Sequence, residues 1–197
     1  MNQPDLVDAA RAAGIGAAKP FQVGSRPVHD GRIVHLSIDT VRYPDGATGE
    51  LELIRHSGAA AVVPFLGSPD QPDSHVVLLR QFRYAAGGDL YEVPAGRPDR
   101  EGEPWEEVAR RELEEETGYV ASRLRRLTTI YTTPGFTDER IHLFRATGLT
   151  RGTAALDDDE FVEVVYLPFS EALAAIGDGR IIDAKSVCAL LFAARFT

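Results

Sequence analysis

The sequence has one cysteine, an excess of acidic over basic residues and no long apolar run, and each of these shortages excludes a class of protein. Cys188 alone cannot form an intrachain disulfide, and within the apolar run VCALLFAA it is expected to be a small buried side chain. No run approaches the roughly 18 apolar residues of a membrane span. The N-terminal residues lack the basic flank and apolar core of a secretory signal. We therefore expect a cytoplasmic protein that does not associate with membranes.

The formal net charge is -9, from 21 basic and 30 acidic side chains. This balance disfavours electrostatic attraction to nucleic acid or to an anionic membrane, and no basic tract interleaved with aromatic residues is present. An acidic protein that handles a phosphorylated substrate needs a local cation to receive it.

The order of apolar and turn-rich segments predicts a mixed β-sheet flanked by helices, of the α+β class. Two β-prone runs, IVHLSIDTVRY and ELELIRH, flank the turn-rich PDGATG and indicate a hairpin. A lone hairpin is marginal in water, so this one is expected to pack on the rest of the chain or on another subunit. The predicted parts are a tail or short helix over 1–22, an N-terminal antiparallel β subdomain over 23–57 and a main domain over 58–197.

A helix is predicted over 104–117, with a proline at its start and Gly118 just past its end. Most of its charges are explained without any function. Glutamates and arginines alternate at i,i+4 spacing in two rows, and each such pair stabilises a helix by about 0.2–0.5 kcal/mol. The rows are Glu106–Arg110–Glu114 and Glu107–Arg111–Glu115.

Glu112 and Glu116 do not fit this lattice. At about 100° per residue they fall about 20° either side of Trp105, in the apolar sector that should face inward, and Glu115 lies about 80° away on its shoulder. Buried carboxylates without a cation are very costly, and a hard divalent cation would resolve the conflict. The alternative is a surface helix whose inward face has been misassigned.

The stretch from Gly96 to Tyr119 resembles the Nudix box, whose pattern is G-x5-E-x7-R-E-U-x-E-E-x-G-U with U apolar. Two departures occur: six residues instead of five separate Gly96 from Glu103, and the last position is Tyr119 instead of an aliphatic residue. The residues that match in register are Glu103, Arg111, Glu112, Leu113, Glu115, Glu116 and Gly118.

Segments outside the box are similar to the ADP-ribose pyrophosphatase branch of that family. These segments are RQFRY, DLYEVPAG, TTPGFTDER and DDDEFVEV. In that branch a proline typically stands about fifteen residues after the box, and Pro134 is fifteen past Tyr119. The resemblance implies an α/β/α sandwich fold and hydrolysis of ADP-ribose to AMP and ribose 5-phosphate.

The resemblance also implies the metal site. Glu112, Glu115 and Glu116, with the backbone carbonyl of Ala95, would hold Mg²⁺, for which Mn²⁺ should substitute. Gly96, Gly118 and Pro134 would be structural, Arg111 would orient a box carboxylate, and Glu103 would be an outer or lesser ligand.

Roles outside the box are implied in the same way. The catalytic base would be Asp158 or Glu160 in the DDDE run, although such a run is otherwise an ordinary solvated turn. Arg83 would contact the diphosphate, or else be a strand arginine paired with a carboxylate. Glu139 corresponds to a ribose contact, and Arg55 and His56 lie where the N-terminal sheet of relatives approaches the adenine.

The resemblance further implies a homodimer that exchanges the N-terminal sheet. The rival functions are hydrolysis of another nucleotide sugar, of NADH or of a nucleoside triphosphate, and, in a different class, a non-catalytic domain that binds a nucleotide or a protein.

Overall fold

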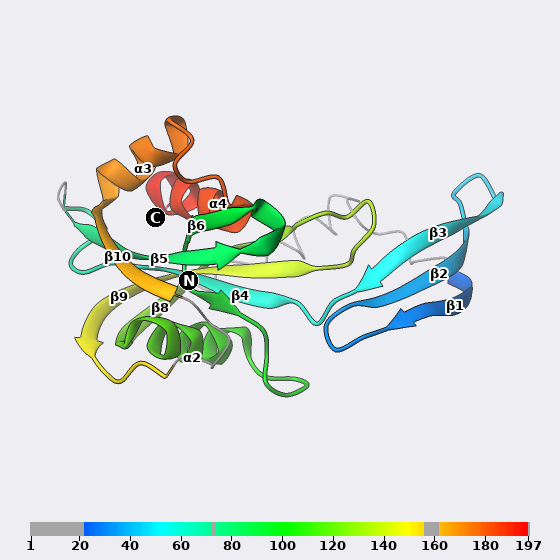
Figure 1. The fold of residues 1–197 in the computed structure, drawn as a ribbon, viewed down its shortest axis with the longest axis horizontal. Coiled ribbons are helices and arrows are strands. Elements are labelled where there is room, and N and C mark those ends of the chain that lie inside the picture. Colours follow the sequence, from blue (N-terminus) through cyan, green and yellow to red (C-terminus); the bar gives the residue numbers. More distant parts are fainter. Residues whose placement is uncertain (1–21, 72–73, 156–161, 197) are drawn as a thin grey trace. The chain divides into compact units, whose positions relative to one another are not determined.

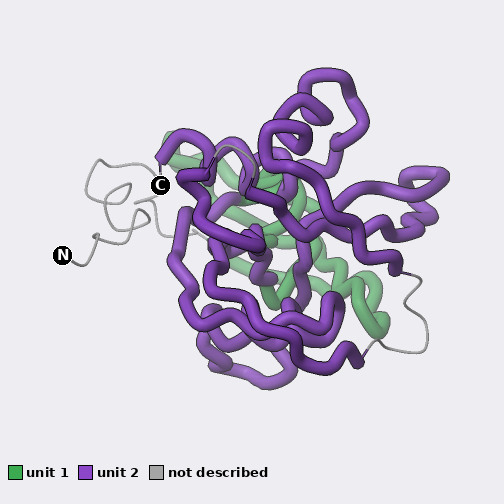
Figure 2. Tube along the Cα trace, turned by 90° about the vertical axis from the view of Figure 1, so that its left-hand side faces the viewer, with its two compact units in different colours: residues 1–58, 131–140 green, residues 59–130, 141–197 purple. Residues whose placement is uncertain are grey.

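The computed structural model describes residues 22–71, 74–155 and 162–196 (Figure 1). The chain forms two compact units (Figure 2). Unit 1 comprises residues 1–58 and 131–140, and unit 2 comprises residues 59–130 and 141–197.

Unit 1 contains a three-stranded antiparallel sheet in the order β1-β2-β3. Its strands are β1 (Gln22–Asp30), β2 (His35–Arg42) and β3 (Thr48–Arg55). The predicted hairpin is confirmed as β2 and β3, with Gly46 at a φ of 88° in the turn. We did not predict β1 as a separate strand. It contains Gly24 and Pro27, which weaken a strand pattern, and its pairing with β2 is irregular beside both residues.

Unit 2 is built on two sheets, one mixed and one antiparallel. The mixed sheet has the order β7-β4-β9-β8, in which β4 pairs parallel with β9 and antiparallel with β7. The antiparallel sheet has the order β10-β5-β6. The bounds are β4 (Ala59–Pro64), β5 (His75–Arg83), β6 (Gly88–Glu92), β7 (Ala95–Gly96), β8 (Tyr119–Tyr131), β9 (Arg140–Arg151) and β10 (Val162–Pro168). A short 3-10 turn, Tyr84–Ala86, joins β5 to β6.

Strand β4 lies at the centre of unit 2 and is buried along its whole length. Its alternating side chains enter two separate cores, because successive residues of a strand point to opposite faces. Ala61 and Val63 pack with α3 (Phe169–Gly177) and α4 (Ala184–Arg195), whereas Ala60 and Val62 pack with α2 (Trp105–Thr117). Figure 1 shows α2 on one side of the β4 sheet and α3 with α4 on the other. The predicted α/β/α arrangement is confirmed.

Helix α2 begins after Pro104 and ends at Gly118, whose φ of 69° is left-handed. Glycine adopts this conformation without the cost that a Cβ imposes. The Gly118 N–H donates to the Glu114 carbonyl at 2.8 Å and closes the helix. This helix therefore has the bounds and the cap that its sequence predicts. Across the described residues, no helix is long and apolar enough to span a membrane.

Candidate active site

Arg111 on α2 donates hydrogen bonds from one nitrogen to two of the predicted metal ligands, Glu112 and Glu115. Its Nη1 donates to Glu112 Oε1 at 2.9 Å and to Glu115 Oε2 at 2.8 Å. Its Nη2 donates to the Arg97 carbonyl at 2.7 Å, which fixes the guanidinium against the loop after β7. Burial works to lower the pKa of Arg111, but Glu112 and Glu115 outweigh it and raise that pKa. The arginine is therefore a permanent cation between the carboxylates.

The expectation that Glu112 has no cation of its own is wrong. A helical projection gives only the direction in which each Cβ points. The long side chain of Arg111 can still bend round the helix and reach Glu112, the next residue. Arg110 keeps one predicted pair of its row, with Glu106 at 3.2 Å, and its Nη1 also donates to the Ala121 carbonyl at 2.5 Å, outside that row. Arg110 is therefore hydrogen-bonded to the neighbouring strand β8, whereas Arg111 is hydrogen-bonded to the box carboxylates.

Glu116 lies on the inward face, as its position on the helix predicts, and is only 4% exposed. Its Oε2 accepts a 2.9 Å hydrogen bond from the Ala95 N–H. Ala95 lies in β7, where it pairs with Ala61 of the buried strand β4. Ala95 thus contacts Glu116 through its N–H. The role of its carbonyl as a metal ligand, which the resemblance implies, stays a prediction.

Gly96 follows Ala95 and lies against Glu112. A Cβ built at Gly96 would stand 2.0 Å from Glu112 Oε1, far inside van der Waals contact. The glycine therefore provides the space that the Glu112 carboxylate occupies, and a larger residue would displace that carboxylate.

The loop between β7 and α2 contains Glu103, whose side chain is 7% exposed. Its Oε2 accepts a 2.9 Å hydrogen bond from the Asp99 N–H, and its Oε1 lies 3.8 Å from Arg111 Nε. Asp99 Oδ2 lies 3.2 Å from the same Nε. Glu103 thus closes the six-residue loop after Gly96 and adds to the negative charge around Arg111.

Among the described residues, no three histidine, cysteine, aspartate or glutamate side chains are grouped closely enough to hold a metal ion as they stand. The donor chemistry nevertheless suits a hard cation, because carboxylate oxygens are the ligands that Mg²⁺ prefers. Glu112 and Glu115 both reach one cationic nitrogen, so their oxygens already converge on a single positive charge. The residues present fit a divalent cation, provided that the carboxylates turn away from Arg111.

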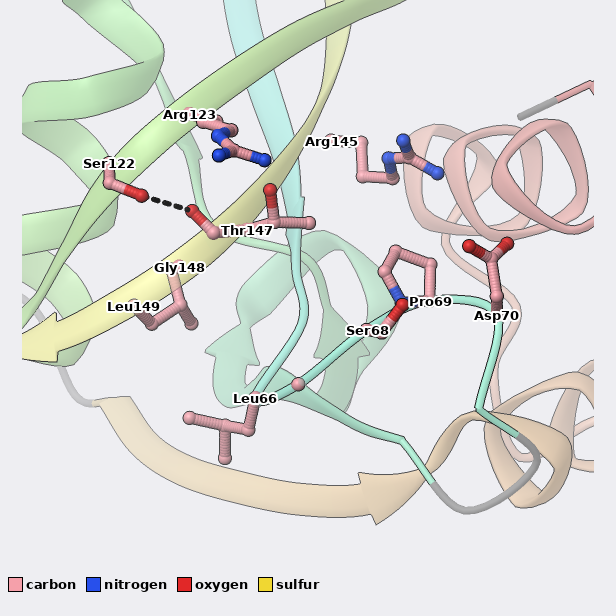
Figure 3. Close-up of a pocket in the computed structure, with 11 residues that line it drawn as sticks. Leu66, Ser68, Pro69, Asp70, Ser122, Arg123, Arg145, Thr147, Gly148 and Leu149 are labelled. Carbon is pink, nitrogen blue, oxygen red and sulfur yellow. Dashed lines mark hydrogen bonds between the residues drawn. The ribbon is translucent and has the colours of Figure 1, made fainter.

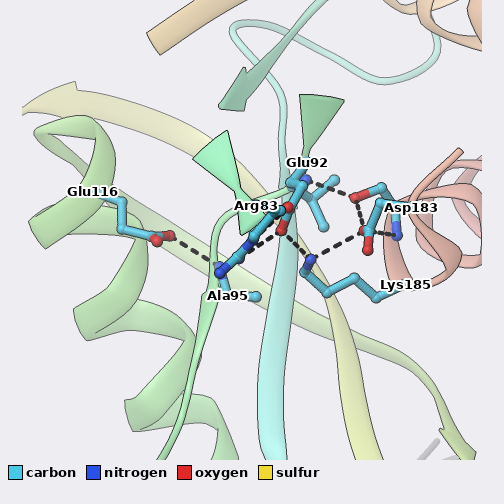
Figure 4. A network of polar contacts seen from close by, with 8 residues as sticks. Arg83, Glu92, Ala95, Glu116, Asp183 and Lys185 are labelled. Atoms are coloured by element: carbon cyan, nitrogen blue, oxygen red, sulfur yellow. Dashed lines mark hydrogen bonds and ion pairs between the residues drawn. The ribbon is translucent and has the colours of Figure 1, made fainter. Parts of the chain in front are cut away.

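Behind the carboxylates lies a charged network that the sequence analysis did not identify (Figure 4). Glu92 at the end of β6 is 2% exposed and accepts from Arg83 Nε at 2.7 Å and from Arg83 Nη2 at 2.8 Å. Lys185 of α4 also contacts Glu92, and its Nζ lies 3.0 Å from Asp183 Oδ2. Burial would raise the pKa of Glu92, but Arg83 and Lys185 outweigh it and lower that pKa.

The network reaches both the core and the carboxylates. Asp183 caps α4 by accepting from the Ser186 N–H at 3.0 Å, and Ser186 Oγ accepts from the Val93 N–H at 2.8 Å. The hydrogen bonds that Arg83 donates to Glu92, and then the negative charges of Glu92 and Glu116, raise the pKa of Arg83. An aspartate just before a helical run is a capping signal and could have indicated Asp183, but no local pattern pairs Lys185 with Glu92. Arg83 is thus paired with a carboxylate in the structure, and its contact with the diphosphate stays a prediction.

Unit 1 brings together the three residues predicted to contact the nucleoside. Arg55 Nη1 lies 3.2 Å from Asp138 Oδ2, and the His56 N–H donates to Asp138 Oδ1 at 2.8 Å. His56 Nδ1 lies 3.5 Å from Glu139 Oε1, and Glu139 Oε2 accepts from Thr132 Oγ1 at 2.6 Å. The polar group therefore joins the end of β3 to the segment before β9.

Pro134 is exposed in a turn between β8 and β9, where the Phe136 N–H donates to the Thr133 carbonyl at 3.1 Å. Its structural role stays a prediction. Asp158 and Glu160, the two candidates for the catalytic base, lie outside the described residues.

The family model for the NUDIX domain matches residues 56–190. The chain is 38% identical over 172 residues to a protein of Bacillus methanolicus named methanol dehydrogenase activator, a match that covers 86% of this chain and 90% of that protein. It is 34% identical, with the same coverage of both chains, to the ADP-ribose pyrophosphatase of Bacillus subtilis strain 168.

A solved structure described as an ADP compounds hydrolase has the same fold. It superposes with a TM-score of 0.76 and covers 91% of this chain and 94% of its own, at 23% sequence identity. The match extends over both units and supports the fold assignment.

Proposed function

This chain belongs to the NUDIX family and is a Nudix hydrolase, and from that premise we propose that it cleaves the pyrophosphate bond of ADP-ribose with Mg²⁺ as cofactor. The products are AMP and ribose 5-phosphate. The observation that carries the proposal is the convergence of Glu112 and Glu115 on one cationic nitrogen, beside the buried Glu116. The relative named ADP-ribose pyrophosphatase, of which 90% is covered, supports the choice of substrate.

In this proposal Glu112, Glu115 and Glu116 hold the divalent cation, together with the carbonyl of Ala95. When bound, the cation supplies the positive charge that a diphosphate needs to accept an attacking water and to release a phosphate. Arg111 positions Glu112 and Glu115 before binding and stays as a neighbouring cation afterwards. The acidic chain thereby acquires a local positive centre for an anionic substrate.

Other residues orient the substrate. Arg83 contacts the diphosphate, and Glu92 holds its guanidinium in one orientation through two hydrogen bonds. Arg55, His56 and Glu139 contact the ribose and the adenine. A water molecule loses its proton to Asp158 or to Glu160.

We also propose that the sheet of unit 1 forms a homodimer in the cytoplasm. All nine residues of β1 are exposed. The exposed apolar side chains of this sheet include Val23, Val28 and Leu51. A three-stranded sheet with so much exposed apolar surface gains stability by covering it.

The test is a comparison of kcat/KM for ADP-ribose, ADP-glucose, GDP-mannose, NADH and nucleoside triphosphates, each with Mg²⁺ and with EDTA. We expect ADP-ribose to be the best substrate, and EDTA to abolish its hydrolysis. Better turnover of NADH, of another nucleotide sugar or of a triphosphate would assign the chain to that substrate instead. No turnover of any ADP-sugar at high Mg²⁺ would reject the proposal.

The metal carboxylates are tested by Glu116→Gln, with Glu107→Gln as the matched control. Both lie on α2, but Glu107 is exposed whereas Glu116 is buried beside Ala95. We expect Glu116→Gln to lower kcat by about a hundredfold or more with circular dichroism unchanged, and Glu107→Gln to retain activity. Equal activity of the two variants would contradict the metal assignment, whereas a wild type without hydrolytic activity would favour a domain that only binds nucleotide or protein.

A further inference from the structure

A cleft of about 730 Å³ lies within unit 2, between the loop after β4 and strands β8 and β9 (Figure 3). An adjoining cavity of about 480 Å³ shares four of its lining residues. None of the residues assigned above to metal or substrate lines either hollow. The shared lining residues are Ser122, Arg123, Arg145 and Thr147.

The two hollows are basic, although the chain has a net charge of -9. Arg123 and Arg145 line the cleft, where Asp70 is the one lining carboxylate among the residues that the structure describes, and Arg125 lines the adjoining cavity. The remaining charges there, Glu106 and Arg110, are paired with each other at 3.2 Å. Within the described part of the chain, three arginines thus face one carboxylate, that of Asp70, so the local charge favours an anion.

Arg145 is half-buried, whereas Arg123 and Arg125 are exposed. Arg145 Nε is buried and has no hydrogen-bond partner among the residues that the structure describes. Burial first, and then repulsion from Arg125, lower the pKa of Arg145, and the attraction of Asp70 opposes them only in part. A buried donor without a partner costs about 1–3 kcal/mol, so the free protein maintains this arrangement at a cost in stability that a bound acceptor would relieve.

Hydroxyl groups complete the lining. Figure 3 shows Arg123 and Arg145 on neighbouring strands, with the hydroxyl of Thr147 beside them and Ser68 on the loop, whereas the Ser122 hydroxyl donates to the Thr147 carbonyl at 3.4 Å. Planar guanidinium groups bind phosphate with two parallel hydrogen bonds, and hydroxyls add further donors. The cleft also has the size of a small-ligand site, for which volumes of about 300–1,000 Å³ are usual.

We propose that this cleft is a second anion site, separate from the active site, that binds a small phosphate-bearing ligand: an inorganic oligophosphate or the phosphates of a nucleotide. A compact tetrahedral anion can enter the cleft and reach the half-buried Arg145. An acidic protein segment needs only exposed arginines, and it would leave the buried Nε without a partner.

The test uses the full chain in EDTA, so that no divalent cation recruits phosphate to the active site, and titrates it calorimetrically with inorganic pyrophosphate. We expect Arg145→Gln and Arg123→Gln each to weaken binding at least tenfold. Arg180→Gln, in an exposed arginine outside the cleft, and Glu116→Gln should leave it unchanged. Circular dichroism checks the fold of each variant, and Arg123, which is exposed, keeps the test valid if Arg145→Gln does not fold.

Pyrophosphate affinity that is equal in wild type, Arg123→Gln and Arg145→Gln would overturn the proposal. A parallel titration with AMP separates the two sources of phosphate. Tighter Arg145-dependent binding of AMP assigns the site to a nucleotide, and tighter binding of pyrophosphate assigns it to a free oligophosphate. Arg145-dependent binding of a polyglutamate peptide, without pyrophosphate binding, would replace the proposal with a protein-docking surface.

Discussion

Gly96 and Glu112 approach each other so closely that a Cβ at Gly96 would stand 2.0 Å from Glu112 Oε1. The two residues lie on β7 and α2, and Arg111 donates both to Glu112 and to the carbonyl of Arg97, the residue that follows Gly96. The absence of a side chain at position 96 therefore determines where a carboxylate of α2 can be. This relationship links the first glycine of the box to its first helical glutamate through space.

Gly96→Ala is expected to reduce activity much more than stability. The atoms that the new Cβ meets are the end of a flexible side chain, so Glu112 can swing away without moving the backbone. Its carboxylate then no longer converges with that of Glu115. We expect kcat to fall by about a hundredfold and the Mg²⁺ concentration needed for half-maximal activity to rise, with a Tm close to that of the wild type.

The matched control is Gly177→Ala, because a Cβ at Gly177 meets nothing within 4 Å. It should keep both activity and Tm. A Gly96→Ala enzyme with wild-type kinetics would show that the placement of Glu112 does not matter for catalysis.

The charged network behind the active site should contribute unequally to stability. Glu92→Gln leaves Arg83 and the nearly buried Lys185 without their shared carboxylate, and breaking a buried pair in this way costs about 3 kcal/mol or more. Lys185→Met leaves Glu92 paired with Arg83 and should cost about 1.5 kcal/mol. Urea unfolding measures both. A larger loss in Lys185→Met than in Glu92→Gln would mean that Arg83 does little to stabilise Glu92.

Acid should destabilise the protein in part through Glu92. Its pKa is lowered in the folded chain, below the value of about 4.3 of a free glutamate. A depressed folded pKa adds stability that is fully present above the unfolded pKa and is lost as pH falls through the folded pKa. The free energy of unfolding should therefore decrease below about pH 4.3, and less steeply in Glu92→Gln. Parallel slopes for the two proteins between pH 5 and pH 3 would contradict this role.

The proposed homodimer predicts a clear effect of charge on the sheet of unit 1. Leu51 of β3 is 45% exposed in the single chain, so Leu51→Glu should cost little within one subunit but should place a charge in the subunit interface. We expect light scattering coupled to gel filtration to give a dimer for the wild type and a monomer for Leu51→Glu. Glu50→Gln, a change at an exposed neighbour, should remain dimeric. A monomeric wild type would reject the dimer.

The sequence predicted well where the deciding interactions are local. The bounds of α2, its left-handed Gly118 and the inward direction of Glu116 follow from proline and glycine placement and from the helical period. The continuous apolar run of β4 likewise forms a strand that is buried along its whole length. Strand β1 was not predicted, because glycine and proline interrupt its pattern and its pairing with β2 sustains it.

By itself, then, the sequence determined the fold class, the helix that bears the carboxylates and which of them face inward, because helix periodicity and caps act within a few residues. Only the tertiary structure decided which partners the charges have beyond the i,i+4 pairs Glu106–Arg110 and Arg111–Glu115. Arg110 turns to β8, Arg111 turns to Glu112, and Glu92 meets Lys185 across 93 residues of chain. Such choices depend on which strands and helices become neighbours and on how deeply each group is buried. A long side chain reaches several possible partners, and only the packed chain selects among them.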